Sequence, residues 1–586
     1  MKRKNLLVLL LALILLFSST GCNNKMETNN KENIFKVENE KGKEKVHEPE
    51  YGGKLILPLT TLNTLNPLLS ENLFYYHFSK LIFEGLFDFD DNLDVIPVLA
   101  NSYTIEDSGK TIHIKLKENV IWHDGEKFTA EDVAFTINTI KYANEDTAYK
   151  RMLNNSIGIY NPKNINRIIN VEILGPYELN IAFDRSFSHG LETLTFPIIP
   201  KHEFVSDREN KKSYVGALSK DDYTPIGTGP YKYISYEKFK TIELNSFPEY
   251  RNGKPYIDTI IGKVLENEEL ILTAFETGQL HLAIPLDVDW EKYDQNNRIK
   301  IYEFISQDYE FLGFNFAKGI FAGENSRNIR RAFAYGIDRQ KIIQNIYLGH
   351  GTQVETPIYP NSWLTWEDSN IYGYNPKKAR EELEKLGWKD VDGDGLYEDE
   401  NGGKVIIRLL TNPDNLLRTK TADMIIGDLN KIGIKVEKDY PEILAENLNE
   451  EIIEAQWEEV NGKLSKKDFD MVLLGWHLPT IPDLSFAFHS SQIKTGTNFI
   501  SYNNENMDEI LFEAFSAENR DAKLKSYKKL QSHIVGELPY ISLFFKNNAL
   551  LVDKMVMGDI DPSFFNYYRN IEKWYIPKEF QHDGVE

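Results

Sequence analysis

Cysteine is almost absent from this chain, which has one cysteine in 586 residues. A single cysteine cannot form an intramolecular disulfide, so a disulfide-stapled fold is excluded. Positive charge is also in deficit, because 67 lysines and arginines stand against 89 aspartates and glutamates, for a formal net charge of −22. That balance argues against a protein that binds the phosphate backbone of nucleic acids, since such binding needs clustered positive charge.

The chain also lacks a hydrophobic run of the about 20 residues that a membrane-spanning helix needs. Its amino terminus carries 12 apolar residues, Leu6–Phe17, directly after a basic stretch at 2–4. A basic start followed by a short apolar run is typical of a secretory signal peptide, which we predict over residues 1–21. Cleavage there would remove three basic residues and no acidic one, so the mature chain would carry a charge of −25.

The lone cysteine, Cys22, follows the small residues Ser18 to Gly21. This arrangement resembles the lipobox of bacterial lipoproteins, in which the cysteine is acylated and becomes the first residue of the mature chain. Ser19 stands where a leucine is usual in that motif. We predict lipidation at Cys22 and a lipid anchor on the outer face of the cytoplasmic membrane, which is the periplasmic side if an outer membrane exists. The alternative is an ordinary secretory signal with an incidental cysteine.

Motifs of common hydrolases and nucleotide-binding enzymes are missing as well. The sequence contains no G-x-S-x-G, no H-E-x-x-H and no P-loop pattern. Its 12 histidines show no spacing typical of metal ligands. We therefore predict a protein that is not an enzyme and has no catalytic residues, no cofactor and no metal site.

One acidic loop leaves a bound cation open. Asp390, Asp392, Asp394 and Gly395 have the spacing of the first half of a calcium-binding loop. The twelfth position of that loop, counted from Asp390, is Asn401 instead of glutamate. Turns rich in aspartate and glycine also occur without any metal, so both interpretations stay open here.

A charged stretch separates the signal from the folded body. Asn23–Glu50 holds 13 charged residues among 28 and shows no hydrophobic periodicity. This composition predicts a disordered, lipidated tether over residues 22–50. A flexible chain of that length spans roughly 30 Å, so the body could turn freely near the membrane.

The rest of the chain has the patterns of a large α/β protein. A length of 586 residues with 41% hydrophobic residues predicts two or more domains. Lys110–Lys117 alternates apolar and polar residues as a half-buried strand does, and Thr129 and Asp132 then have the spacing of a helix cap. Further helices are predicted at 326–348, 377–387, 417–433, 506–515 and 524–538, and strands at 241–247, 260–265, 309–316, 405–411, 470–476 and 541–548.

Several motifs together resemble one protein family. Residues 122–137 read WHDGEKFTAEDVAFTI and resemble the signature of the family 5 extracellular solute-binding proteins, the peptide- and nickel-binding receptors of ABC importers. His281 stands where the family frequently has aspartate. Other segments resemble the family in the same order, over about residues 50–580: GTGPY (227–231), NSFPEYRNGKPYIDTI (245–260), FETGQLHLA (275–283), IRRAFAYGIDRQKII (329–343), YNPKKAREELEKLGW (374–388) and LNKIGIKVE (429–437).

This resemblance implies an α/β fold of the class II periplasmic-binding-protein type, a two-lobed clamp with an extra subdomain in the first lobe. Lobe 1 would contain residues 51–311 and 545–586, with the extra subdomain at about 86–205. Lobe 2 would contain residues 312–544. The WHDGEKFTAEDV signature falls in the extra subdomain, so we expect it to be structural.

The same resemblance implies a ligand enclosed between the lobes. Peptide-binding members hold an extended peptide through main-chain hydrogen bonds and leave its side chains in roomy, wet pockets. Positions matching the ligand contacts of the family are Tyr75, Tyr76, His77, Asn315, Trp476, Thr497, Asn498 and Phe544. Core packing is the alternative role for the tyrosines and for Trp476.

One position departs from the peptide-binding members. Many of them have an aspartate shortly after the glycine–tryptophan pair, and this aspartate binds the amino terminus of the peptide. The matching residue here is Pro479. Asp483, four residues further on, is the candidate replacement. A buried carboxylate there would favour a cationic group through charge-assisted hydrogen bonds.

Taken together, the residues and the resemblance predict a substrate-binding lipoprotein that captures oligopeptides and delivers them to the permease of an ABC importer. Its partners would be the permease and ATPase subunits and, through the lipid anchor, the membrane. We expect a monomer that does not bind nucleic acid. The alternatives are a receptor for a nickel chelate or an oligosaccharide, or a receptor for peptide signals; a secreted hydrolase is disfavoured.

Overall fold

The computed structural model describes residues 36–38, 44–142, 147–153, 168–206, 208–219, 223–323, 325–369, 371–441 and 449–581. The chain divides into two units, residues 1–48 and 49–586. In the first unit, β1 (Lys36–Glu38) pairs antiparallel with β2 (Glu44–Val46), inside the stretch where the charged composition predicts no regular structure. All other described elements belong to the second unit. The predicted signal peptide and Cys22 lie outside the described residues.

A four-stranded sheet with the strand order β10-β11-β12-β3 contains the first ordered strand of the second unit. Its strands are β3 (Lys54–Thr60), β10 (Tyr231–Glu237), β11 (Thr241–Ser246) and β12 (Thr259–Leu265). Leu55, Leu57 and Leu59 lie on the same face of β3, because successive side chains of a strand point to opposite faces. All three are fully buried. Their cluster also contains residues of α2 (Leu73–Ser79) and α6 (Glu268–Glu276).

A second sheet, β6-β7-β9-β8, lies within residues 86–205. Its strands are β6 (Ala100–Glu106), β7 (Thr111–Leu116), β8 (Ile168–Gly175) and β9 (Glu178–Phe183). In β7, Ile112 and Ile114 are buried while His113 bonds to polar groups on the other face. Helix α3 (Ala130–Tyr142) begins at the predicted cap, where the Thr129 N–H donates to Asp132 Oδ2 at 2.8 Å. Both local predictions are confirmed.

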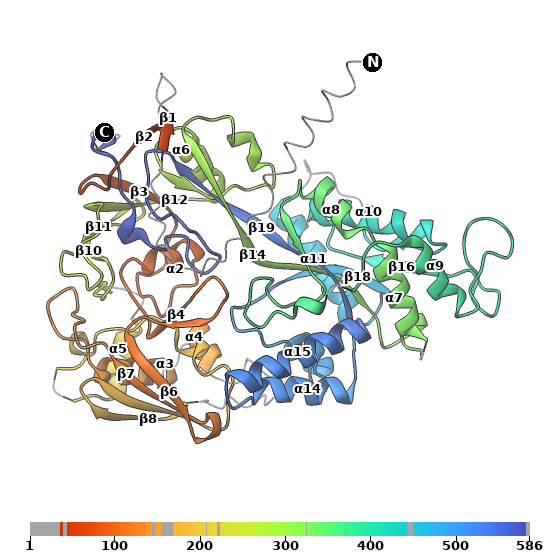
Figure 1. Cartoon of the computed structure of the whole chain (residues 1–586), viewed down its shortest axis with the longest axis horizontal. Helices are drawn as coiled ribbons and strands as arrows, with labels where there is room; N and C mark the ends of the chain where they lie inside the picture. Colours follow the sequence, from red (N-terminus) through yellow and green to blue (C-terminus); the bar gives the residue numbers. More distant parts are fainter. Residues whose placement is uncertain are drawn as a thin grey trace, which may run out of the picture. The chain divides into compact units, whose positions relative to one another are not determined.

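The largest sheet follows the path β13-β19-β14-β18-β16-β17, with β15 paired to β19. Its strands are β13 (Leu282–Ala283), β14 (Ile299–Phe314), β15 (Gly351–Gln353), β16 (Ile406–Leu410), β17 (Lys435–Lys438), β18 (Met471–His477) and β19 (Tyr540–Asp553). The long strands β14 and β19 pair antiparallel, from Ile299 opposite Asp553 to Gly313 opposite Tyr540. They run from the region of β3 and β12 to that of β16 and β18 (Figure 1). The exact lobe boundaries stay a prediction.

The described residues of the second unit also include α-helices and two short strands. They are β4 (Phe87–Phe89), β5 (Val95–Pro97), α4 (Ala148–Leu153), α5 (Lys211–Ala217), α7 (Ser326–Gly336), α8 (Arg339–Ile346), α9 (Pro376–Glu384), α10 (Leu416–Lys431), α11 (Glu450–Ser465), α12 (Ser485–Phe488), α13 (Gln492–Thr495), α14 (Glu505–Phe515) and α15 (Arg520–Glu537). Among the described helices, none has the length and apolar character to cross a membrane.

The single helix predicted over 326–348 is wrong, because the structure has two helices there, α7 and α8. Ile337 adopts an extended conformation with a ψ of 123°. The Asp338 side chain then caps α8 by accepting a hydrogen bond from the Lys341 N–H at 3.1 Å. An aspartate directly before a helix is a recognised start signal, which the apolar periodicity of the whole segment obscured.

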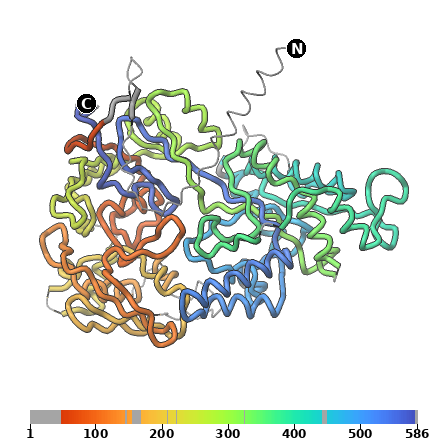
Figure 2. The backbone as a smooth tube through the Cα atoms, in the orientation of Figure 1, coloured from red at the N-terminus to blue at the C-terminus, as the bar shows by residue number. Residues whose placement is uncertain are grey.

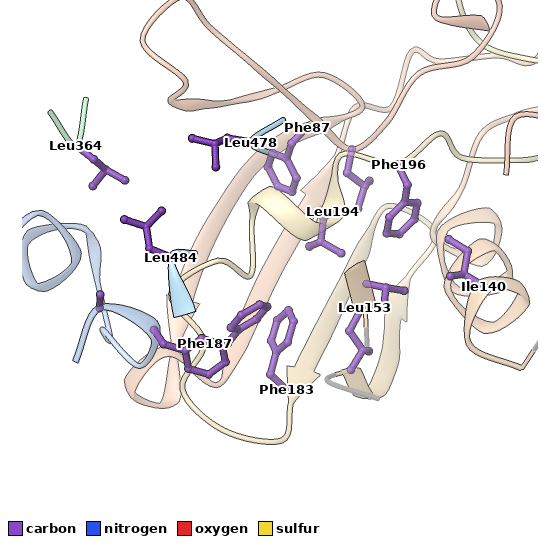
Figure 3. Packing of buried hydrophobic residues seen from close by; sticks show 14 of the residues in the cluster. Phe87, Ile140, Leu153, Phe183, Phe187, Leu194, Phe196, Leu364, Leu478 and Leu484 are labelled. Atoms are coloured by element: carbon purple, nitrogen blue, oxygen red, sulfur yellow. The ribbon is translucent and has the colours of Figure 1, made fainter. Parts of the chain in front are cut away.

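Three large hydrophobic clusters form the cores. One joins the sheet β10-β11-β12-β3 to the end of the chain. Residues 549–576 therefore lie beside this sheet, as the tube in Figure 2 also shows. A second surrounds α7, α8 and α10. The third is continuous from residues 86–205 to β18, the segment after it and α14–α15. Figure 3 shows members from residues 86–205, among them Phe87 and Phe183, and from the segment after β18, Leu478 and Leu484.

Candidate functional site

A pocket of about 550 Å³ lies between segments that are far apart in the sequence, and we call it the central pocket. Residues 478–484, directly after β18, form one wall, and residues 357–364 contribute a second one. Leu93, Glu192, Gln307, Phe545 and Phe564 come from the predicted lobe 1 and also line the pocket. The pocket therefore lies where the resemblance implies a cleft between lobes.

A larger and more polar pocket of about 1050 Å³ adjoins it, and we call it the polar pocket. Tyr76, Tyr149, Tyr250 and Tyr568 contribute aromatic rings to its lining. Thr480 lines both this pocket and the central pocket, so the two are neighbours.

A third pocket of about 600 Å³, the rim pocket, shares Glu192 and Trp363 with the central pocket. Arg520 and Lys523 of α15 also line it. The shared residues place the three pockets in a row, with the central pocket between the polar and the rim pocket.

Charged side chains of the polar pocket form two ion pairs. Arg251 donates from Nη2 to Glu84 Oε1 at 2.7 Å and from Nη1 to Glu84 Oε2 at 2.5 Å. Burial lowers the pKa of Arg251 and Glu84 raises it, with a net shift upward, so the guanidinium stays charged. Lys80 donates to Asp88 at 3.2 Å. Glu572 also lines the pocket and belongs to neither pair.

Residues 86–205 contact α14 and α15 through what we call the rim contacts. The Ser188 N–H donates to the Phe515 carbonyl at 3.0 Å, and its hydroxyl donates to the Ala514 carbonyl at 2.7 Å. Lys523 forms an ion pair with Glu192, in which both side chains are buried, and donates to the Ser188 carbonyl at 2.9 Å. These contacts cover one side of the row of pockets.

A second part of the rim contacts is more exposed. Arg520 Nη1 lies 2.5 Å from Asp94 Oδ1, with exposed fractions of 55% and 34% for the two side chains. The Arg520 guanidinium also lies over the Trp363 ring, 3.9 Å from its centroid. A cation so placed is attracted by the negative face of the ring.

Two predicted ligand residues line the pockets. Tyr76 lies in the polar pocket and Asp483 in the central pocket, beside Pro479. Asp483 Oδ1 accepts a hydrogen bond from the Ser485 N–H at 2.9 Å, at the start of α12. The proposed contact of Asp483 with a ligand amine stays a prediction.

Two more predicted ligand residues are Trp476, near the end of β18, and Thr497, which lies between α13 and α14. Trp476 is partly buried and its ring stacks on Phe311, with 6.1 Å between the ring centroids. Thr497 is exposed, and its hydroxyl donates to the Phe486 carbonyl at 2.6 Å. Their contacts with a ligand also stay predictions.

Five predicted ligand residues are buried with partners inside the protein, namely Tyr75, His77, Asn315, Asn498 and Phe544. The amide of Asn315 bonds to the Lys467 and Phe469 carbonyls, and that of Asn498 to the His489 and Tyr502 carbonyls. The aromatic rings pack in the same way: His77 stacks on Tyr567, and Tyr347 meets Phe544 edge-on. Burial lowers the pKa of His77, so its ring is neutral. None of the five is among the lining residues of the three pockets, and their contacts with a ligand stay predictions.

The two strongest family motifs pack against one another. His123 Nε2 bonds to the Gly229 carbonyl at 3.0 Å, and the Gly227 N–H donates to His123 Nδ1 at 3.3 Å. A Cβ on Gly227 would lie only 1.8 Å from the Ile82 carbonyl oxygen, so no side chain fits there. These contacts give the WHDG and GTGPY motifs a structural role, as predicted for the first of them.

Two acidic clusters among the described residues have ligand atoms close enough together to hold a metal ion. One is Asp124, His202 and Glu203, and the other is Asp390, Asp392 and Glu398 in the loop that resembles a calcium site. In the second, Lys404 forms ion pairs with Asp392 and Asp394. Of the three residues of this cluster, the lysine thus engages Asp392.

The residues that sequence reasoning missed are Glu192, Lys523 and Glu572. None belongs to a recognisable motif, and a charged residue in a sequence is ordinarily read as exposed. Glu192 and Lys523 form a buried ion pair only because two segments that are far apart in the sequence contact each other. Thr480 was also missed, although its position next to Pro479 was a signal that could have found it.

The sequence of this chain is similar to a known protein family and to several of its members. The profile of the bacterial extracellular solute-binding proteins, family 5 Middle, matches residues 94–498. The oligopeptide-binding protein AppA of Bacillus subtilis is 28% identical over 558 residues, which cover 93% of this chain and 95% of AppA. A putative ABC transporter peptide-binding protein of Brucella ovis is 27% identical over 316 residues, 53% of this chain and 56% of that protein.

Solved structures agree with the fold. The structure of Bacillus subtilis AppA in complex with a nonapeptide has a TM-score of 0.59 at 26% identity, and the match covers 91% of this chain and 100% of AppA. NikZ from Campylobacter jejuni in complex with Ni(L-His) has a TM-score of 0.62 at 25% identity, covering 89% of this chain and 99% of NikZ. These similarities confirm the predicted α/β fold, a two-lobed clamp.

Proposed function

The chain belongs to family 5 of the bacterial extracellular solute-binding proteins, and on that premise we propose that it captures oligopeptides between its lobes and delivers them to the permease of an ABC importer. Proteins of this family are binding components of transporters and not enzymes. The partners are then permease and ATPase subunits, and transport energy comes from the ATPase.

The observation that carries the peptide proposal is the row of three pockets. A row of adjoining pockets suits an extended chain whose successive side chains enter different pockets, while its main chain bonds to the protein. The polar and central pockets hold both apolar rings and charged groups, so they can take varied side chains. The similarity to an oligopeptide-binding protein over 93% of the chain supports the same ligand class.

The ligand itself tests this proposal directly. Protein purified without added ligand is denatured, and the released small molecules are identified by mass spectrometry. We expect a mixture of peptides bound in about equal molar amount to the protein. A nickel chelate or an oligosaccharide in place of peptides would contradict the peptide proposal and leave the transport role intact.

We also propose that the chain is a lipoprotein anchored through Cys22 to the outer face of the cytoplasmic membrane. The basis is the short apolar run before the lone cysteine. Replacing the residue (Cys22→Ser) should move the protein from the membrane fraction to the soluble fraction, and should abolish labelling by a fatty acid. Unchanged membrane association with no fatty-acid label in either protein would contradict the lipid anchor.

A further inference from the structure

The polar pocket contains more acid than its own cations neutralise. Its lining carries three carboxylates, Glu84, Asp88 and Glu572, and one ammonium group, Lys80. Lys80 pairs with Asp88, and Arg251 behind the wall pairs with Glu84 through two hydrogen bonds. With both pairs counted, the Glu572 carboxylate is left over.

Glu572 sits in a short 3-10 helix, Ile571–Lys573, near the end of the chain and is half-buried. In the part of the chain that the structure describes, no side chain forms a hydrogen bond or an ion pair with its carboxylate. Burial raises the pKa of Glu572, and the neighbouring charge of Glu84 raises it further, against the opposing effects of its own N–H, Lys573 and Arg251. The carboxylate is thus half-buried and has no side-chain partner of opposite charge in the described part of the chain.

The surroundings of Glu572 suit a cation. Tyr76, Tyr149, Tyr250 and Tyr568 line the same pocket, and the faces of aromatic rings attract ammonium groups. The Tyr250 hydroxyl donates to Glu84 Oε1 at 3.0 Å, so that hydroxyl is already engaged. An ammonium group entering here would be the missing partner of Glu572, and charge-assisted hydrogen bonds are the stronger ones.

The pocket is also placed where one end of a peptide would lie. Thr480 belongs to both the polar and the central pocket. Its neighbour Pro479 carries no carboxylate and also lines the central pocket. Asp483 lies on the central pocket, and one of its oxygens already accepts the Ser485 N–H at 2.9 Å.

We infer that the polar pocket is the subsite for the cationic group of the ligand, with Glu572 as the carboxylate that binds the terminal ammonium of a peptide. This inference rests on the proposed peptide-binding function. It moves the amine-binding acid from the loop after β18 to the carboxy-terminal segment. The peptide main chain then runs from the polar pocket past Thr480 into the central pocket.

The test uses two pools of random hexapeptides, one with free and one with acetylated amino termini. The pools are mixed in equal amounts, and the captured peptides are quantified by mass spectrometry. The wild-type protein should prefer the free-amine pool by about tenfold or more, since a hydrogen bond to a charged group is worth that much. Glu572→Gln should bring the ratio close to one while acetylated peptides are captured as before.

Glu269→Gln is the matched control. This substitution removes the same charge as Glu572→Gln, but Glu269 is exposed on α6. It should keep the wild-type preference. A wild-type preference in Glu572→Gln would overturn the inference, and so would loss of the preference in Asp483→Asn with Glu572→Gln unaffected. If the wild-type protein captures neither pool, the peptide-binding function itself fails, which is a different outcome.

Discussion

The strand pair β14–β19 and the rim contacts both join segments that are far apart in the sequence, but their chemistry differs. The strand pair is held by main-chain hydrogen bonds along a long register, and its own residues include fully buried rings such as Phe311 and Phe544. The rim contacts depend on a few polar side chains, chiefly the Lys523–Glu192 ion pair and the Ser188 hydroxyl. The strand pair is part of a sheet, whereas the rim contacts form an interface between two surfaces.

This difference indicates how a clamp can open without unfolding. Main-chain bonds in the interior of a sheet cannot separate unless the sheet is lost, whereas polar side chains at a surface can bond to water instead. Two-lobed binding proteins close by rotation about a hinge of a few residues. We therefore expect β14–β19 to stay intact throughout, and the rim contacts to form when the lobes close over a ligand.

The largest effect is expected from Glu310→Gln in β14. Glu310 is 2% exposed and accepts from Arg418 at 2.7 and 2.9 Å and from Lys546 at 3.1 Å. Removing this charge leaves two cations without their partner, and breaking a buried pair costs about 3–5 kcal/mol. Urea unfolding of the ligand-free protein measures the loss. Glu437→Gln, at an exposed pair, should change the free energy of unfolding by about 0.5 kcal/mol or less. Equal effects of the two would contradict the role of the strand pair.

The same carboxylate predicts a pH dependence of stability. Burial raises the pKa of Glu310, but Arg418 and Lys546 outweigh it and lower the pKa from 4.5 to about 2. Because the folded pKa lies below the unfolded one, the stabilisation is complete above pH 4.5 and is lost as the pH falls from 4.5 to 2. The loss should reach about 3 kcal/mol. Unfolding curves of wild type and Glu310→Gln, recorded over this range, should converge at low pH; parallel curves would contradict the assignment.

Lys523→Met tests the rim and should act on binding instead of unfolding. In the closed form it leaves Glu192 buried without a partner, so peptide capture should weaken by about a hundredfold or more. If the rim is open without ligand, the free energy of unfolding of the ligand-free protein should change by less than about 1 kcal/mol. Titration with the hexapeptide pool and urea unfolding together give both values. Normal capture with strongly reduced stability would show that the rim does not open.

The smallest effect is expected from Asp94→Asn. The pair with Arg520 is partly exposed, and exposed ion pairs contribute about 0.2–1 kcal/mol. Peptide capture should therefore fall by less than about fivefold, and the difference from wild type should vanish at high salt because salt screens exposed charges. An effect as large as that of Lys523→Met would mean that the exposed half of the rim matters as much as the buried half.

Local features of the fold could be predicted from sequence because they depend on neighbouring residues. The alternation of β7 and the cap of α3 at Thr129 and Asp132 are examples. The family motifs could be recognised too, but not their physical reasons. Gly475 precedes Trp476, and a Cβ there would lie 2.7 Å from Arg418 Nη2 and 2.9 Å from Glu310 Oε1. The glycine leaves room for a buried ion pair that no pattern in the sequence reveals.

The candidate site was harder to predict, because its residues come from many segments that are far apart in the sequence. Tyr76 and Asp483 line the pockets, while the side-chain amides of Asn315 and Asn498 donate to main-chain carbonyls of the protein. A short polar side chain looks the same in a sequence whether it faces a ligand or a backbone carbonyl. Glu572 shows the opposite case, in which an ordinary surface-like residue becomes significant only through burial.

Amide hydrogen exchange of the stretch around Ser188 tests the central claim most directly. Its N–H bonds across the rim to the Phe515 carbonyl at 3.0 Å, whereas the amides of 309–314 belong to the strand pair. We predict that adding the hexapeptide pool strongly slows exchange around Ser188 and leaves 309–314 protected to the same extent. Equal protection around Ser188 with and without peptide would contradict a rim that closes on the ligand.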